Sequence, residues 1–73
     1  MKPIRFSAHA LSYTWKRGFT EAEVQEAIRS SPWEPAELGR QWNGKVYQTK
    51  QVKPIFVEEA DEILVVTVYT YYF

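Results

Sequence analysis

The segment FSAHALSYTWKRGFT, residues 6–20, holds the single histidine of the chain, with Tyr13 four residues after it and Arg17 four residues after Tyr13. On a helix this spacing places the three side chains close together on one face. An imidazole titrates near neutral pH and a guanidinium presents a planar fork to anionic oxygens, so the row could transfer a proton or bind phosphate. The alternative is that His9 is a structural helix residue, since no carboxylate lies near it in sequence.

A second set of candidates lies between Gly39 and Lys53, where the chain has basic residues and no acid: Arg40, Lys45, Lys50 and Lys53. If residues 45–50 form a strand, Lys45 and Tyr47 share one face. We then expect Arg40, Lys45 and Lys53 to bind phosphates and Tyr47 to stack on or position an unpaired base, an arrangement that suits RNA. The alternative is a solvated face whose lysines prevent edge-to-edge association of sheets.

The C-terminal segment ILVVTVYTYYF is the longest candidate strand, and we expect most of it, including Tyr69, to belong to the core. Tyr71 and Tyr72 lie near its end and could project beyond the last strand pair. Aromatic side chains give a large contact area at a low entropic cost, so these two tyrosines are candidates for a partner-binding surface.

Composition excludes several classes of site. One histidine and no cysteine cannot form an ordinary zinc site, and three glycines do not provide a phosphate-binding loop. We therefore expect no metal and no cofactor, and any catalysis would be metal-independent acid–base chemistry. The nine basic and nine acidic residues cancel, so no overall field attracts nucleic acid. No apolar run is long enough to span a bilayer, and a soluble cytoplasmic protein is expected.

Two helices are expected to position the first set of residues. Ser7 is a suitable N-cap for a helix that runs to about Arg17, and Gly18 suits the left-handed position that ends helices. Thr20 and Glu23 have the spacing of a capping box that begins a second helix. The core stripe of this second helix is predicted to be Val24, Ala27 and Ile28.

After Pro35 the pattern changes to strand signals. Asn43 and Gly44 are typical of a hairpin turn, and strands are expected over residues 45–50, 52–57 and 63–72, with an acidic turn at 58–62. We predict a single α+β domain over residues 1–73. Two N-terminal helices form a helical hairpin that packs on one face of a three- to four-stranded antiparallel sheet.

Three segments in this order, FSAHAL, KRGFTEAEVQEAI and VVTVY, resemble a small bacterial and archaeal family, the domain of unknown function numbered 4258. That family is similar in turn to the RelE/ParE superfamily of toxins from toxin–antitoxin systems, including BrnT. The likeness runs from Ile4 to Tyr69, and the matching positions are His9, Arg17, Gly18 and Glu23. The resemblance implies an α+β fold, an RNA-cleaving activity and inhibition by an antitoxin protein.

Two functions remain open from the sequence. The first is a toxin that acts as a metal-independent ribonuclease of the mRNA interferase type, with His9, Arg17 and Tyr47 as catalytic residues. The second is a non-catalytic interaction module, which forms a homodimer or binds a small partner protein through an exposed strand and the terminal tyrosines. The expected partners are accordingly RNA, an antitoxin or a second copy of the chain, and no membrane.

Overall fold

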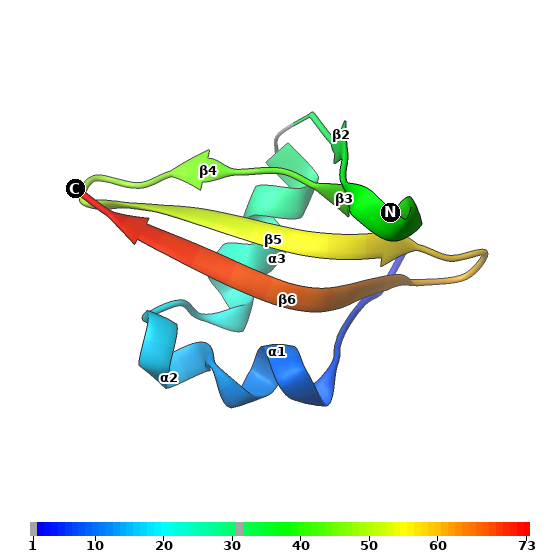
Figure 1. The fold of residues 1–73 in the computed structure, drawn as a ribbon, viewed down its shortest axis with the longest axis horizontal. Helices are drawn as coiled ribbons and strands as arrows, with labels where there is room; N and C mark the ends of the chain where they lie inside the picture. The colour runs from blue at the N-terminus through cyan, green and yellow to red at the C-terminus, as the bar shows by residue number, and fades with distance from the viewer. Residues whose placement is uncertain (1, 31) are drawn as a thin grey trace.

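The computed structural model describes residues 2–30 and 32–73. The elements in chain order are β1 (Ile4–Phe6), α1 (Ala8–Ser12), α2 (Thr14–Arg17), α3 (Glu21–Ser30), β2 (Glu34–Pro35), the 3-10 turn η1 (Glu37–Gly39), β3 (Gln41–Trp42), β4 (Lys45–Val46), β5 (Lys50–Glu58) and β6 (Ile63–Tyr72). The strands form one sheet in the order β1-β6-β5-β3-β2, and β4 also pairs with β5. Figure 1 shows α3 crossing one face of this sheet, while α1 and α2 lie beside β6.

The prediction of a three- to four-stranded antiparallel sheet under a helical hairpin is wrong. The sheet has six strands and is mixed, because β1 pairs with β6 in parallel, with Ile4 opposite Ile63 and Phe6 opposite Val65. A strand of three residues is too short for a period of two to be visible, and its partner lies at the other end of the chain. Its pairing is therefore set by tertiary structure and not by a local signal.

The expected first helix is divided into α1 and α2. Ser7 is the N-cap, as predicted, and its side-chain oxygen accepts a hydrogen bond from the amide of Ala10. The helix is interrupted at Tyr13, where the side chains of Ser12 and Thr14 donate to the carbonyls of His9 and Leu11. Hydroxyl groups that bond to the preceding turn compete with regular helical hydrogen bonds, which explains the interruption.

The second helix agrees closely with its sequence signals. The amide of Thr20 donates to the Glu23 carboxylate and the amide of Glu23 donates to the Thr20 hydroxyl, so the capping box is present at the start of α3. The buried residues of α3 are the predicted stripe, Val24, Ala27 and Ile28. Val24 and Ile28 pack in one core with Ala10, Phe19 and the inward side chains of β5 and β6, which are Val52, Phe56, Ile63, Val65 and Val68.

Asn43 and Gly44 do not form the predicted hairpin turn. Trp42 is paired with Ile55 and Lys45 with Val52, so β3 and β4 continue along β5 in one register. That register places Asn43 opposite Pro54, which has no amide hydrogen to donate, and the ladder is interrupted there. The Asn43 side chain is buried and donates to the Ala27 carbonyl of α3. The asparagine therefore connects the sheet to the helix.

The predicted strand over residues 45–50 is also wrong. β4 ends at Val46, and the chain turns between Tyr47 and Lys50, where the Tyr47 amide donates to the Lys50 carbonyl over 2.7 Å. The expected acidic turn is present, since the Glu59 amide donates to the Glu62 carbonyl over 2.8 Å between β5 and β6. None of the helices in the described ranges has the length and apolar character that crossing a membrane requires.

The two faces of the sheet differ in what covers them. Val52, Phe56 and Val68 point toward α3 and are buried. The alternate positions of β5 and β6, which include Lys53 and Tyr69, point to the opposite side. In Figure 1 this is the near side, which none of α1, α2 and α3 covers. We call this surface the open face, and define it by Trp42, Lys53, Ile55, Thr67, Tyr69 and Tyr71.

Candidate functional site

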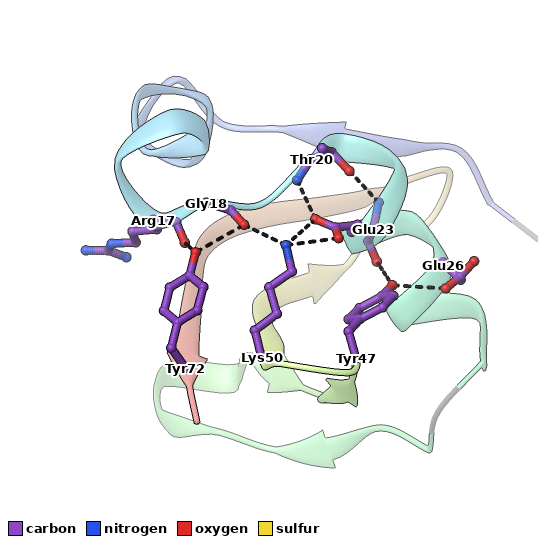
Figure 2. A network of polar contacts seen from close by, with 8 residues as sticks. All are labelled: Arg17, Gly18, Thr20, Glu23, Glu26, Tyr47, Lys50 and Tyr72. Atoms are coloured by element: carbon purple, nitrogen blue, oxygen red, sulfur yellow. Dashed lines mark hydrogen bonds and ion pairs between the residues drawn. The ribbon is translucent and has the colours of Figure 1, made fainter.

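Two lysines of the basic segment point toward α3: Lys45, which was predicted to bind phosphate, and Lys50, which was not. Figure 2 shows Lys50 with its ammonium group between two helix ends: it donates to the Gly18 carbonyl over 2.7 Å and to the Glu23 carboxylate over 3.0 Å. Lys45 forms an ion pair with Glu26 of the same helix at 2.8 Å. The charges of both lysines are therefore compensated by acids of α3, and neither side chain lies on the open face.

Tyr47 belongs to the same polar network. Its hydroxyl group lies 3.0 Å from Glu26 Oε1 and 3.3 Å from the Glu23 carbonyl oxygen (Figure 2). Burial, together with the hydrogen bond to Glu26, raises the pKa of Tyr47 to about 12. Such a phenol stays protonated at neutral pH and is already engaged as a donor. Its position supports a structural contact between the β4–β5 turn and α3 more than a catalytic role.

The acids of this network are held in their charged form. Burial by itself raises the pKa of Glu23, but hydrogen bonds from Lys50 and Thr20 outweigh it and the net pKa is lowered. For Glu26, the hydrogen bond from Lys45 and then that from Tyr47 lower the pKa. Opposite charges and donors favour the ionised carboxylate, so both ion pairs are present at neutral pH.

Tyr72, predicted to bind a partner, closes the other side of the same network. Its hydroxyl group lies 3.1 Å from the Arg17 carbonyl oxygen and 3.5 Å from that of Gly18. Gly18 has a φ of 71°, and a Cβ atom at this residue would overlap the Tyr72 hydroxyl oxygen. The end of β6 is thus attached to the C-terminus of α2. We call this contact the Tyr72 latch.

On the open face, aromatic rings lie beside basic groups. Tyr69 and Tyr71 remain 43% and 49% exposed, and their ring centroids are 6.5 Å apart at an interplanar angle of 31°. Lys53 is directly opposite Tyr69 in the strand register, and its ammonium group lies 4.2 Å from the centroid of the Trp42 ring. Among the described residues, Lys53 has no acidic partner within ion-pair distance. The face therefore offers exposed rings next to an uncompensated cation.

Arg17 lies at the margin of this face. Its guanidinium carbon is 4.0 Å from the centroid of Tyr13 and 5.1 Å from that of Tyr69. Nη1 donates to the Val68 carbonyl over 2.8 Å and to the Thr67 hydroxyl over 3.3 Å. In the described part of the chain, Nε and Nη2 make no hydrogen bond and no carboxylate pairs with the group. Figure 2 shows the side chain directed away from the Tyr72 latch, and its free donors are available to an anion.

The predicted row of His9, Tyr13 and Arg17 exists in part. The rings of His9 and Tyr13 meet edge-on with centroids 4.9 Å apart, and Tyr13 in turn contacts Arg17. His9 is an exposed residue of α1. The three proposed catalytic residues do not converge, because Arg17 lies at the open face whereas Tyr47 faces α3. Tyr13 and Arg17 thus lie between His9 and Tyr69 in this row of contacts.

Arg40 lies apart from the lysines, in an open hollow of about 450 Å³ formed by β2, η1 and the start of β3. Of the residues predicted to meet RNA, Lys53 thus lies on the open face and Arg17 at its margin, and the predicted partner residue Tyr71 lies on the same face. Sequence reasoning missed Tyr69 and Trp42. Strand alternation places Tyr69 on the same side as Thr67 and Tyr71, so its position beside Tyr71 was predictable. Both sides of this strand carry apolar residues, however, and the sequence therefore does not indicate which side is exposed.

Within residues 2–30 and 32–73, no cluster of three or more potential metal ligands is found. Comparison of the chain with protein-family models, with curated proteins and with solved structures found no match.

Proposed function

We propose that the open face binds single-stranded RNA. Bases would stack on Tyr69 and Tyr71, and phosphates would pair with Arg17 and Lys53. The observation that carries this proposal is the pair of exposed, adjacent tyrosine rings, of which Tyr69 is flanked by Arg17 and Lys53. These two cations have no acidic partner among the described residues. Stacking on aromatic side chains combined with basic groups beside them is how proteins hold unpaired strands. RNA, in preference to DNA, is what the resemblance to the RelE/ParE superfamily implies.

The proposal covers binding and not cleavage. An acid–base mechanism requires its groups within hydrogen-bond reach of one phosphodiester. His9 lies on α1, and the Tyr47 hydroxyl is bonded to Glu26 on the other side of the sheet. A toxin activity and an antitoxin partner therefore rest on the resemblance alone, whereas binding has support from the arrangement of Arg17, Lys53 and Tyr69.

The alternative of an interaction module has weaker support. The strand that contains Pro54, β5, is paired with β6 on one side and with β3 and β4 on the other. One further edge is that of β6 beyond Val65, where pairing with β1 ends. Ser7 donates to the Val66 carbonyl and Arg17 to that of Val68, so α1, α2 and the chain before them already occupy this edge. Covered edges resist the addition of a further strand. Self-association through the exposed tyrosines would give a dimer, which light scattering detects.

The test is fluorescence anisotropy with a labelled RNA of about eight nucleotides, within the ~4–16 nucleotides that single-strand-binding domains cover. Loss of stacking costs about 1–3 kcal/mol for each base, so Tyr69→Ala and Tyr71→Ala should each weaken binding at least about 5-fold. Tyr69→Phe keeps the ring and should retain affinity.

Trp15→Ala is the matched control, because Trp15 is 79% exposed on α2 and lies outside the open face. Equal effects of Trp15→Ala and Tyr69→Ala would contradict the proposal, as would binding that is insensitive to both tyrosines. Light scattering of the same samples reports on dimers: a dimer that Tyr71→Ala dissociates, without RNA binding, would favour the interaction module. Recovery of intact RNA in chelator separates binding from cleavage.

A further inference from the structure

Glu34 extends the open face beyond Trp42. It is directly opposite Trp42 in the β2–β3 pair, and directly opposite residues of two strands point to the same side of a sheet. The residue before it, Trp33, packs edge-on against the buried Phe56 with ring centroids 5.0 Å apart, so Trp33 points to the α3 side. Alternation along extended backbone then places Glu34 on the opposite side. The exposed Glu34 side chain is therefore the neighbour of Trp42 on the open face.

Trp42 lies between a cation and an acid. Its strand, β3, lies between β5 and β2 in the sheet, so Lys53 adjoins Trp42 from one side and Glu34 from the other. The Lys53 ammonium group is 4.2 Å from the centroid of the Trp42 ring. Within residues 2–30 and 32–73, Glu34 makes no ion pair and no side-chain hydrogen bond. An aromatic ring, a cation and an acid with free acceptor oxygens are thus neighbours on one surface.

The Trp42 ring is a surface on which a base can stack. The contact of an ammonium group with an aromatic ring at an exposed site is weaker than the stacking of a base on such a ring. A base therefore displaces Lys53 from the ring, and the ammonium group becomes available to a phosphate of the same strand. Since β3 lies two strand spacings from β6, about 10 Å, one RNA strand can cover Tyr69 and Trp42 together.

The acceptor oxygens of Glu34 favour a base with two neighbouring donors. A carboxylate has two acceptor oxygens and no donor. Unpaired bases are recognised through hydrogen bonds on their Watson–Crick edges. Guanine presents two adjacent N–H groups there, on N1 and N2. Adenine and cytosine present one donor beside an acceptor nitrogen, and uracil presents one donor between two carbonyl groups. An acceptor that faces a carboxylate is repelled, so guanine matches Glu34 best.

We infer that the open face contains a guanine-selective site. The base stacks on Trp42, its N1–H and N2–H groups donate to the Glu34 carboxylate, and Lys53 pairs with the phosphate. The inference rests on the proposed function, because it specifies one nucleotide of the RNA bound there. Stacking on a ring accepts every base, whereas hydrogen bonds to a carboxylate discriminate between bases. Glu34 is accordingly the residue that determines sequence preference.

Fluorescence anisotropy tests the inference with octauridine and with octamers in which one uridine is replaced by guanosine, adenosine or inosine. One guanosine should tighten binding at least about 5-fold, the discrimination that a bidentate contact to a base provides. Inosine keeps N1–H but lacks the N2 amino group, so its affinity should fall between those for guanosine and uridine. Adenosine controls for the larger ring of a purine and should give a smaller gain than guanosine.

Glu34→Gln should abolish the preference for guanosine over adenosine. Glu37→Gln is the matched control: Glu37 is an exposed acid of the neighbouring η1 turn without an ion pair among the described residues, and its loss changes the net charge equally. This control should keep the preference. In NMR spectra, the guanosine octamer should shift the indole signal of Trp42 more than that of Trp33. The Trp42 signal is identified by its absence from the spectrum of Trp42→Phe.

The outcomes separate this inference from the proposed function. A guanosine preference that Glu34→Gln alone removes, together with the shift at Trp42, would support the site. RNA binding that depends on Tyr69 but does not distinguish guanosine from adenosine would overturn the inference alone. A preference that persists in Glu34→Gln, or that Glu37→Gln removes equally, would do the same. Failure of every octamer to bind would overturn the proposed function and the inference together.

Discussion

Gly18 is the residue at which backbone and side-chain requirements coincide. Its φ of 71° ends α2, and the Tyr72 hydroxyl occupies the space that a Cβ atom would need. Gly18→Ala should therefore lower the free energy of unfolding by about 1–2 kcal/mol for the left-handed conformation alone. Displacement of the Tyr72 latch adds to this loss. Urea denaturation monitored by circular dichroism measures the change.

A double variant separates the two contributions. Tyr72→Phe removes the hydroxyl oxygen that a Cβ atom at Gly18 would meet, but it leaves the φ angle unchanged. Gly18→Ala should consequently cost less in the Tyr72→Phe background than in the natural chain. Equal costs in both backgrounds would show that the overlap with Tyr72 contributes nothing and that the backbone angle accounts for the whole effect.

At the scale of elements, Lys50 is the point where three of them meet. From the start of β5 it contacts the carbonyl that ends α2 and the Glu23 carboxylate in the first turn of α3. Lys50→Met should lower the free energy of unfolding at pH 7 by about 1.5–3 kcal/mol, the usual contribution of charged hydrogen bonds. Lys53→Met is the matched control, because Lys53 makes no ion pair in the described part of the chain.

The pH dependence of that loss follows from Glu23. Its pKa is lowered in the folded protein, so the ion pair stabilises the fold above the unfolded pKa of about 4.3. The stabilisation is lost as the pH falls through the lower, folded pKa. The difference between the natural chain and Lys50→Met should therefore be largest near neutrality and shrink below about pH 4. A difference that stays constant down to acid pH would exclude Glu23 as the partner.

Local signals predicted the elements whose partners are close in sequence. The Ser7 cap, the Thr20–Glu23 capping box and the stripe of Val24 and Ile28 are confirmed, because each depends on contacts within one or two helical turns. Elements that depend on distant partners were missed. β1 forms only by pairing with β6. Asn43 and Gly44 stay extended because the residues on both sides of them pair with β5, and Pro54 of β5 explains the gap in that ladder.

The candidate site was predictable only in its residue types. The sequence indicates lysines and tyrosines after Gly39, but the side on which each points depends on where the chain turns. The turn at Tyr47–Lys50, in place of a continuous strand, directs Lys45 and Lys50 toward the acids of α3. Lys53 lies beyond the turn on the opposite side. Strand alternation determines which side chains share a side of the sheet, but only the packing of α3 determines which side is covered.

At the scale of the whole molecule, the net charge is zero, but the basic groups that pair with α3 and those at the open face lie on different surfaces. Within residues 2–30 and 32–73, four basic residues are ion-paired, and the basic groups left at the open face are Arg17 and Lys53. Each phosphate neutralised on a single strand contributes about −0.7 to the slope of log K against log salt. RNA binding should thus show a slope of about −1.4, or about −2 if Arg40 also takes part.

The slope is measured by repeating the anisotropy titration over a range of salt concentrations. Lys53→Met should reduce its magnitude by about 0.7, whereas Lys45→Met should leave it unchanged because Lys45 is paired with Glu26. A slope steeper than about −3 would mean that Lys45 and Lys50 leave α3 to meet the RNA, and the division of charges between the two faces would then be wrong.

The parallel pairing of β1 with β6 joins segments from the two ends of the described chain. During synthesis, Ile4–Phe6 is made before Ile63–Val65 and has no strand to join until that segment follows. The apolar side chains of α1 and α3 meanwhile lack the half of their core that β6 supplies. The native sheet and core can therefore be completed only after β6 has been synthesised, and contacts so distant in sequence also slow refolding.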